Sequence, residues 1–305
     1  MKNLHLEHPE DTILTGDLSV LDWFKAEGQI SVKIDGCPAI VWGIDPATET
    51  FFVGTKSVFN KVKIKINHSH DEIDANHEGE VASILHDCFD CLPRTNGIIQ
   101  GDFIGYGGDN VYTPNAITYV FDKIITNSII VAPHTAYKAQ KDLRDAESFP
   151  LKNWDMSVTL SSTKDCMFLT PDAWERVDED ILINNMIDFA RQMSQMCEFV
   201  SDSKVAKVKK VINTFIKINA ELDPEALATA ADCDLNLMRF WKLIHTIKMD
   251  MMSLCTDDGP DAYLGKRYCN CGEGYVRSNQ YGTYKLVDRK QFSRYNFLKG
   301  KMTSR

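Results

Sequence analysis

Short apolar runs bounded by turn residues dominate the first half of the chain. They predict strands at residues 29–34, 39–43, 50–53, 97–104, 117–125 and 128–132. The dipeptide Asp45-Pro46 marks the turn between the second and third of these runs. Residues 77–92 instead predict a helix, because their apolar side chains fall on one helical face: Val81, Ile84, Leu85, Cys88, Phe89 and Leu92.

The middle of the chain, from about residue 170 to 256, has apolar residues at helical spacing. Thr170-Pro171-Asp172 is a favourable helix start, since a capping hydroxyl precedes a proline at the first position. The first helix is expected to have one apolar stripe, made of Leu182, Met186, Phe189, Ala190, Met193, Cys197 and Val200. The second is expected to bury Val205, Val208, Ile212, Phe215 and Ile216. A third helix at 235–254 is apolar nearly all round, which predicts burial.

Strand character returns near the end of the chain. Residues 274–278 and 283–287 predict a hairpin, joined by the turn Asn279-Gln280-Tyr281-Gly282. The fold class is therefore expected to be α+β. We expect three parts: the first part of a β-rich core at 1–165, a helical insertion at 166–256, and the second part of the core at 257–305.

Composition narrows the class of protein. With 44% hydrophobic and 25% charged residues the chain has the composition of a soluble globular protein. No run approaches the roughly 18 apolar residues of a membrane helix, and the polar N-terminus lacks a signal-peptide core. Nine scattered cysteines favour reduced thiols. We therefore expect a cytoplasmic protein without a membrane partner.

Charge is unevenly distributed along the chain. The net charge is −9, yet residues 260–305 hold ten Lys or Arg against three Asp or Glu, which leaves about −16 on the remainder. Residues 51–66 add Lys56, Lys61, Lys63 and Lys65 and no acid. Two basic segments on an acidic body suggest a localised polyanion site. On charge alone, an ordinary solvated charged surface is the simpler interpretation. Sequence motifs are therefore needed to choose between that surface and a polyanion site.

The segment Lys33-Ile34-Asp35-Gly36 is the first candidate for chemistry. A lysine at a strand end before a glycine turn can hold its amine at a fixed place. As a nucleophile it must be neutral, and desolvation or neighbouring cations lower a lysine pKa in that direction. Such a short motif also occurs on ordinary surface turns, so its value depends on the motifs later in the chain.

Four further motifs come after it in order: Gly101-Asp102-Phe103, Phe121-Asp122, Glu273-Gly274-Tyr275-Val276 and Tyr284-Lys285-Leu286. The series runs lysine, acid, aromatic, acid, lysine, each on a predicted strand near a turn. An ATP site needs such a set: a nucleophile, carboxylates for ribose and Mg²⁺, a ring for adenine and cations for phosphate. Taken singly, each residue also has an ordinary role as core, turn cap or surface charge.

This order resembles the ordered motifs of the covalent nucleotidyltransferases, which include ATP-dependent polynucleotide ligases and mRNA capping enzymes. The resemblance covers residues 30–66, 97–125 and 270–297, and it is greatest to phage RNA ligases, whose late signature also runs Glu-Gly-Tyr-Val before an aromatic-Lys strand. It implies the nucleotidyltransferase fold of antiparallel sheets with flanking helices and an inserted helical subdomain. No C-terminal OB domain is expected, because the chain ends soon after the late motif.

The resemblance also implies roles for the cationic motifs. Lys33 resembles the lysine that becomes joined to AMP, within a nucleotide-binding turn that includes Asp35 and Gly36. Lys56 resembles the basic residue that contacts ribose or phosphate. Lys285 resembles the late lysine that contacts the α-phosphate.

Carboxylate and adenine-binding roles are implied in the same way. Asp102 resembles the acid that binds ribose or a metal, and Glu273 the carboxylate that assists metal binding. Phe121 resembles the ring that stacks on adenine, with Val276 on the other adenine face. The implied cofactors are ATP and Mg²⁺ or Mn²⁺.

Three departures from the family pattern stand out. Cys37-Pro38-Ala39 follows the glycine where ligases often have a polar group. Asp102 stands where glutamate is usual. Val287 replaces the second lysine of the late motif, so Arg289 or Lys290 would have to supply that charge.

The expected function is therefore an ATP-dependent polynucleotide ligase working through lysyl-AMP at Lys33. Its partner would be a nucleic acid with 5′-phosphate and 3′-hydroxyl ends, RNA favoured over DNA. It would act in the cytoplasm, that of the host if the chain comes from a phage. The alternatives are adenylyl or guanylyl transfer to another acceptor, and a degenerate nucleotide-binding relative without ligase turnover.

A structural zinc site is a separate alternative. Two cysteine pairs, Cys88 with Cys91 and Cys269 with Cys271, could supply thiolates, and four histidines lie near the first pair: His68, His70, His77 and His86. Cys88 lies on the predicted buried helix face, which disfavours this interpretation. His134 is expected to be structural rather than catalytic.

Overall fold

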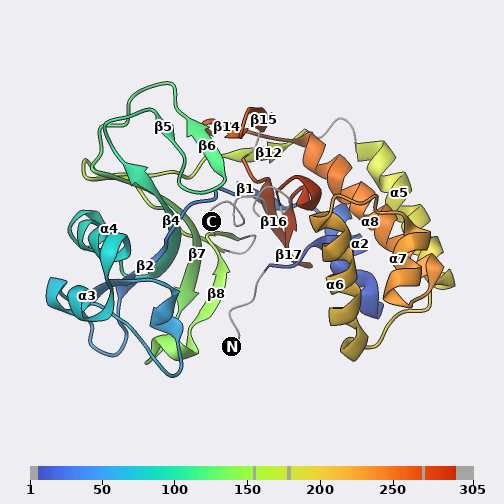
Figure 1. Ribbon diagram of the computed structural model, residues 1–305, viewed down its shortest axis with the longest axis horizontal. Helices are drawn as coiled ribbons and strands as arrows, with labels where there is room; N and C mark the ends of the chain where they lie inside the picture. The colour runs from blue at the N-terminus through green and yellow to red at the C-terminus, as the bar shows by residue number, and fades with distance from the viewer. Residues whose placement is uncertain (1–5, 154–155, 177–179, 270–271, 293–305) are drawn as a thin grey trace. The chain divides into compact units, whose positions relative to one another are not determined.

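The computed structural model describes residues 6–153, 156–176, 180–269 and 272–292. It is a mixed α+β fold with antiparallel and mixed sheets and several helices (Figure 1). The chain divides into two compact units. Among the described residues the first consists of Lys33–Pro171 and Gly259–Gly272, and the second of Leu6–Val32, Asp172–Asp258 and the residues from Glu273 on. The second unit thus combines the helical middle of the sequence with segments near both ends.

The first unit is built on a six-stranded mixed sheet. Its main path runs β11-β7-β4-β2-β3, and β8 pairs with β7. Only β11 and β7 run parallel among these pairs. The strands are β2 (Ala39–Ile44), β3 (Phe51–Gly54), β4 (Ile98–Tyr106), β7 (Ile129–Lys138), β8 (Glu147–Pro150) and β11 (Cys166–Phe168).

Apolar side chains cover both faces of this sheet. On one face Trp42 and Ile99 pack with Leu85 of α4 (Gly79–Cys91), next to α3 (His70–Asn76). On the other face Val41 and Ile98 pack in a smaller cluster beside η2 (Lys56–Phe59) and η3 (Leu143–Asp145). Burial on both faces explains why the sequence of β2 is apolar without alternating. The expected helix at 77–92 and its buried face are confirmed by α4, which buries Cys88.

A second, four-stranded sheet completes the first unit. Its order is β15-β14-β6-β5, and β14 pairs antiparallel with β6, so that Leu264 lies opposite Ile117. A two-stranded pair, β9 (Lys152–Asn153) with β10 (Met156–Ser157), lies apart from both sheets. The strands of the four-stranded sheet are β5 (Val111–Tyr112), β6 (Ile117–Val120), β14 (Asp261–Leu264) and β15 (Arg267–Cys269).

The second unit contains a three-stranded sheet in the order β1-β16-β17. Its strands are β1 (Gln29–Val32), β16 (Tyr275–Asn279) and β17 (Gly282–Leu286), so the predicted late hairpin is confirmed. Glu7 adds an isolated parallel bridge to Tyr284. A short antiparallel pair joins β12 (Ala173–Glu175) to β13 (Cys255–Asp257).

Helices form the rest of the second unit. The predicted helix at 235–254 is confirmed by α8 (Leu235–Leu254), which is capped by the Asp234 side chain and buries nine of its residues. The remaining helical elements are α1 (Pro9–Thr12), η1 (Ile13–Thr15), α2 (Ser19–Lys25), α5 (Asp180–Met193), η5 (Ser194–Met196), α6 (Asp202–Lys217) and α7 (Pro224–Ala231). On α6 the predicted stripe is largely confirmed, with Val208, Ile212 and Ile216 buried.

Of two expectations for the start of the helical segment, one is wrong and the other is partly wrong. Thr170-Pro171-Asp172 begins no helix, because the residues after it form β12 and pair with β13. On α5 the predicted stripe is right at Ala190, which is buried, but the other buried positions differ from it by one residue. Ile183 and Ile187 are buried, whereas Leu182 and Phe189 are 65% and 56% exposed. Both stripes have the three-and-four spacing of a helix, so periodicity alone could not choose between them.

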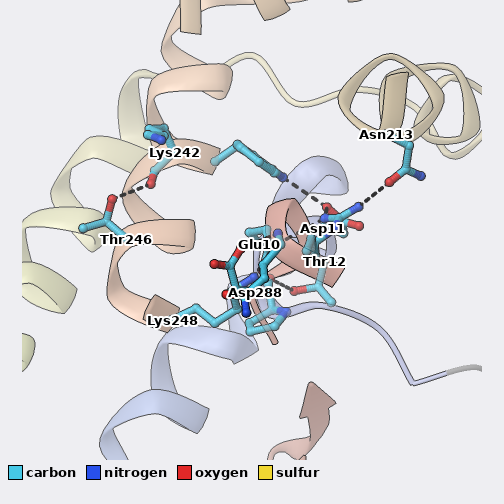
Figure 2. Close-up of polar contacts among 12 residues, drawn as sticks. Glu10, Asp11, Thr12, Asn213, Lys242, Thr246, Lys248 and Asp288 are labelled. Carbon is cyan, nitrogen blue, oxygen red and sulfur yellow. Dashed lines mark hydrogen bonds and ion pairs between the residues drawn. The ribbon is translucent and has the colours of Figure 1, made fainter. Parts of the chain in front are cut away.

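A buried ionic cluster lies inside the second unit (Figure 2). Lys248 of α8 and Glu10 of α1 are both fully buried and pair at 2.7 Å. Arg289 contacts Glu10 at 3.3 Å and Asp11 at 2.9 Å. Trp241 donates its indole N–H to Asp11 at 3.1 Å. The cluster therefore ties α1 and α8 to the residues that follow β17.

No helix in the described part of the chain is both long and apolar enough to cross a membrane.

Candidate functional site

Lys33 directly follows β1 and is half-buried. The turn after it is held from the four-stranded sheet. The amide of Asp35 donates to the Tyr119 hydroxyl at 2.7 Å, and that hydroxyl donates to the Asp35 carbonyl at 3.2 Å. Asn115 donates its side-chain amide to the Asp35 carboxylate at 2.8 Å. These bonds fix the backbone two residues after Lys33.

Gly36 brings this turn against strand β4. A Cβ added at Gly36 would lie 2.5 Å from the Phe103 carbonyl oxygen and 3.1 Å from Cβ of Asp102. The Cys37 amide donates to the Phe103 carbonyl at 3.0 Å. Only glycine allows so close an approach between backbones. The first and second sequence motifs are therefore direct neighbours in the structure.

Gly272 approaches the same turn. Its φ is +60°, and a Cβ built on it would lie 3.6 Å from the Lys33 carbonyl oxygen and 3.6 Å from the Tyr119 ring. The left-handed φ favours glycine at this position. The next residue in the chain is Glu273.

Asp102 lies on β4 within a group of polar side chains. Its carboxylate is 3.6 Å from Nε2 of His134, so the two form an ion pair only when the imidazole is protonated. The Gln100 amide lies 3.4 Å from the same Nε2, and Tyr137 donates its hydroxyl to the Gln100 side-chain oxygen at 2.7 Å. Nδ1 of His134 lies 2.7 Å from the Thr135 hydroxyl.

A β-bulge places His134 in this group. Thr135 lies opposite Gln100 and Pro133 opposite Gly101, so His134 is an extra residue on β7. Bulges re-aim side chains and are frequent beside functional sites. His134 is thus next to a predicted site residue, although only a structural role was expected for it from the sequence.

Two other predicted residues belong to the first unit. Lys56 is exposed at the start of η2, whose cap is the Thr55 hydroxyl accepting from the Ser57 amide. Phe121 directly follows β6 and is half-buried. Its ring packs edge-to-face on Tyr112 at 5.8 Å, and its amide donates to the Asn110 carbonyl at 2.8 Å. The backbone that presents this ring is therefore well anchored.

The late motifs belong to the second unit. Val276 on β16 lies opposite Lys285 on β17. Tyr275 lies opposite Val32, the residue that precedes Lys33 in the chain. The Lys285 amide donates to the Glu7 carbonyl at 3.1 Å. The three-stranded sheet therefore joins the strand that leads to Lys33 with the strands that carry Val276 and Lys285.

Of the two candidates for the missing second cation, Arg289 has another role. It is buried, and its guanidinium pairs with Glu10 and Asp11 and donates to Asn213 at 2.8 Å. Val287 is buried as well. Within the late motif this leaves Lys290 as the candidate for the second charge.

The structure describes three of the four cysteines in the two candidate pairs, and Cys88 and Cys269 are buried. Burial raises the pKa of the Cys88 and Cys91 thiols, and it raises the pKa of Cys166 to about 12. Cys271 lies outside the described residues. No group of three or more His, Cys, Asp or Glu that could hold a metal is found among the residues described.

Two residues that hold the Lys33 turn, Tyr119 and Asn115, were not singled out from the sequence. Tyr119 could have been identified from the sequence, because it lies two residues before Phe121 on the same predicted strand. Along a strand, residues two apart point to the same face. Nothing in the local sequence marks Asn115.

Comparison with known proteins gives a family but no activity. No curated protein and no solved structure matches the chain. A protein family described as a family of unknown function (DUF6267) matches residues 3–234 and 223–301, which together span nearly the whole sequence. The chain therefore belongs to the DUF6267 family.

Proposed function

We propose that this protein is an ATP-dependent polynucleotide ligase that forms a lysyl-AMP intermediate at Lys33. One observation carries the proposal: the turn after Lys33 packs through Gly36 against the strand that carries Asp102. Two motifs separated by more than sixty residues in the sequence are neighbours, as an ATP site requires. The nucleotidyltransferase fold and the likeness to phage RNA ligases are part of this proposal.

The surroundings of Lys33 suit a nucleophilic amine. The residue is half-buried, and the hydrogen bonds between Asp35 and Tyr119 hold its turn in place. A fixed backbone reduces the entropy lost when an amine is aligned with a phosphorus atom.

The proposed first step is an in-line displacement. The neutral amine of Lys33 attacks the α-phosphorus of ATP, so an N–P bond forms as the bond to the pyrophosphate oxygen breaks. Pyrophosphate leaves with the bonding electron pair, and the lysine nitrogen loses a proton to solvent. Lys56 and Lys285 would stabilise the charge that develops on the phosphates.

Asp102 is the residue of the first unit that would hold the divalent cation. Asp102 offers carboxylate oxygens, which Mg²⁺ and Mn²⁺ prefer as ligands, and its side chain is 16% exposed. Bound there, such an ion would supply charge neutralisation on the phosphates. Phe121 would stack on the adenine, with Val276 as the second apolar contact. Glu273, Val276 and Lys285 belong to the second unit and enter the proposal through the motif order alone.

The later steps rest on the family resemblance. AMP would pass from Lys33 to a 5′-phosphate, and a 3′-hydroxyl would then displace AMP to seal the strand. RNA is the favoured acceptor over DNA. The lysines of residues 51–66 would contact the strand through its phosphates, and Lys56, Lys61 and Lys63 are exposed there.

The test tracks the labelled phosphate of the nucleotide. The full chain is incubated with Mg²⁺ and ATP labelled on either the α- or the γ-phosphate, and then denatured. Label retained from the α-phosphate alone supports adenylylation, and its transfer to a 5′-phosphorylated RNA or DNA oligonucleotide identifies the acceptor. Retention from GTP in place of ATP would indicate a guanylyltransferase.

A nucleotide-binding protein without turnover is the second candidate. It is favoured by the replacement of the second late-motif lysine by a buried Val287 and by the use of Arg289 in the ionic cluster. This candidate predicts ATP binding in an equilibrium assay together with no retained α-phosphate label. Retained label would exclude it.

A further inference from the structure

Helices α3 and α4 of the first unit carry the same short pattern, a histidine followed four residues later by an aspartate. The pairs are His70 with Asp74 on α3 and His86 with Asp90 on α4. Residues four apart lie on the same face of a helix. Each helix thus presents one imidazole and one carboxylate side by side.

The two helices exchange partners through these side chains. Nε2 of His70 lies 3.1 Å from the carboxylate of Asp90 on the other helix. Nε2 of His86 lies 2.9 Å from the carboxylate of Asp74. The imidazole rings stack at 4.9 Å with an interplanar angle of 19°, and the Phe89 ring makes a T-shaped contact with His70 at 5.1 Å. Both rings are therefore held by a carboxylate, and His70 also by an aromatic neighbour.

The remaining ring nitrogens point at each other. Nδ1 of His70 and Nδ1 of His86 are 2.7 Å apart. A carboxylate accepts hydrogen bonds, so each Nε2 must carry a hydrogen. In a neutral imidazole the other nitrogen, Nδ1, is then a lone-pair acceptor. Two acceptors at this distance repel unless a positive species lies between them.

We propose that His70 and His86 form a binding site for a divalent transition metal of the Zn²⁺ class, bound through their Nδ1 atoms. Histidines that ligate metals usually donate their other ring N–H to a carboxylate, which fixes the tautomer and raises the basicity of the ligating nitrogen. Asp90 and Asp74 occupy those positions here. Imidazole nitrogen selects Zn²⁺, Cu²⁺ or Ni²⁺ over Mg²⁺, which prefers oxygen.

The required adjustment is small. Zinc–nitrogen bonds of about 2.0–2.1 Å in tetrahedral geometry separate the two nitrogens by roughly 3.3 Å. The rings must therefore open by about 0.6 Å from the 2.7 Å contact. Both can do so, since the side chains are 47% and 28% exposed. No third protein ligand converges with them in the described part of the chain, so water would complete the coordination.

This site is separate from the proposed ligase chemistry. Its residues lie on α3 and α4, whereas the Lys33 turn contacts β4 and β6, so its test does not depend on adenylylation. Surface exposure and the water ligands predict a weaker affinity than that of a closed four-ligand zinc site.

The experiment measures zinc bound by the full, reduced chain in competition with a chromogenic chelator. The variants His70→Gln and His86→Gln are expected to bind one equivalent less than the parent protein. Asp90→Asn is expected to weaken that equivalent about 10–100-fold. His68→Gln is the matched control. His68 lies in the same segment and contacts the carboxylates of Asp45 and Glu72, but faces no second histidine. The His68→Gln variant should bind the same number of zinc equivalents as the parent protein.

A second measurement reads the ring nitrogens directly. In ¹⁵N-histidine NMR spectra, zinc should shift Nδ1 of His70 and of His86, while Nε2 of each keeps its proton. Equal zinc stoichiometry in the parent and both histidine variants would overturn the proposal, because cysteine thiols would then account for the binding. Unshifted Nδ1 resonances with excess zinc would also overturn it and identify a pair that shares a proton.

Discussion

The hydroxyl of Tyr119 bonds both the amide and the carbonyl of Asp35, at 2.7 and 3.2 Å. One buried side chain on β6 thereby fixes the backbone of a turn that begins at Lys33. The same turn is packed against β4 through Gly36. Two different sheets of the first unit therefore define where Lys33 can place its amine.

Removing the Tyr119 hydroxyl should slow adenylylation. We expect Tyr119→Phe to remove both hydrogen bonds that the hydroxyl makes with the Asp35 backbone and to lower the free energy of unfolding by about 1–3 kcal/mol. The rate of label incorporation should fall at least about 10-fold, because the turn loses its anchor. Urea unfolding and the rate of α-phosphate labelling measure the two effects.

Tyr112→Phe provides the matched control. The Tyr112 hydroxyl donates to the Asp109 carbonyl at 2.7 Å in the same sheet, but it does not contact the Lys33 turn. The Tyr112→Phe variant should lose a similar free energy of unfolding without a slower rate of α-phosphate labelling. Equal rates in the two variants would contradict a positioning role for Tyr119.

Gly36 should not tolerate a side chain. In Gly36→Ala the new Cβ would lie 2.5 Å from the Phe103 carbonyl oxygen, so the turn or β4 must shift. We expect a loss of about 1–3 kcal/mol in the free energy of unfolding and little covalent AMP. In Gly97→Ala, the control, the nearest atom is a flexible Ile99 methyl at 3.9 Å. Wild-type labelling in Gly36→Ala would show that the close packing is unnecessary.

Asp102 and His134 should differ in their effects. Asp102→Asn removes the charge of the proposed metal ligand, so we expect the labelling rate to fall roughly 10²-fold and the Mg²⁺ requirement to rise. His134→Gln should reduce the rate less, because the imidazole is 3.6 Å from the carboxylate and acts through it. Titration of Mg²⁺ and Mn²⁺ for each variant separates the two roles. An Asp102→Asn protein with unchanged rate and metal dependence would remove Asp102 from the site.

The histidines near the buried ionic cluster should make the protein sensitive to acid. Burial, helped by the Lys248 and Arg289 charges and opposed by Glu10, lowers the pKa of His8 to about 2 and the pKa of His245 to about 4. Both rings are neutral in the folded protein, whereas the unfolded chain binds protons below about pH 6.5. Their contribution to stability is therefore present above about pH 6.5 and is lost as the pH falls.

The expected slope is up to about 1.4 kcal/mol per pH unit for each histidine between about pH 6.5 and 4.5. Denaturant unfolding at a series of pH values measures it. His245→Gln should reduce the slope by about half, because one of the two neutral rings is then absent. A free energy of unfolding that does not change over this range would mean that neither ring is held neutral.

The elements best predicted from the sequence are those whose local residue pattern is compatible with only one secondary structure and one buried face. Helix α8 is apolar nearly all round and capped by Asp234, and the late hairpin has a clear turn, so both were correct. On α5 two stripes had the same spacing, and contacts with other elements chose the one through Ile183. Thr170-Pro171 looked like a helix start, but pairing with β13 decided otherwise.

Some residues of the candidate site were identified from the sequence and others were not. The order of motifs in the sequence grouped Gly36 with Asp102; the two are neighbours in the structure, and their nucleotide-binding roles stay a prediction. Tyr119 and His134 were missed because their roles depend on tertiary contacts: a hydroxyl reaching another sheet, and a bulge that re-aims a side chain. The use of Arg289 in a buried cluster could not be predicted, since its partners Glu10 and Asp11 lie at the other end of the chain.

The most direct test is the intact mass of the full chain after incubation with ATP and Mg²⁺, beside Lys33→Ala and the exposed-lysine control Lys63→Ala. We expect a gain of one AMP in the parent and in Lys63→Ala, and no gain in Lys33→Ala. An adduct that survives in Lys33→Ala would contradict the assignment of the nucleophile. No adduct in the folded parent, with GTP also tried, would contradict the ligase proposal itself.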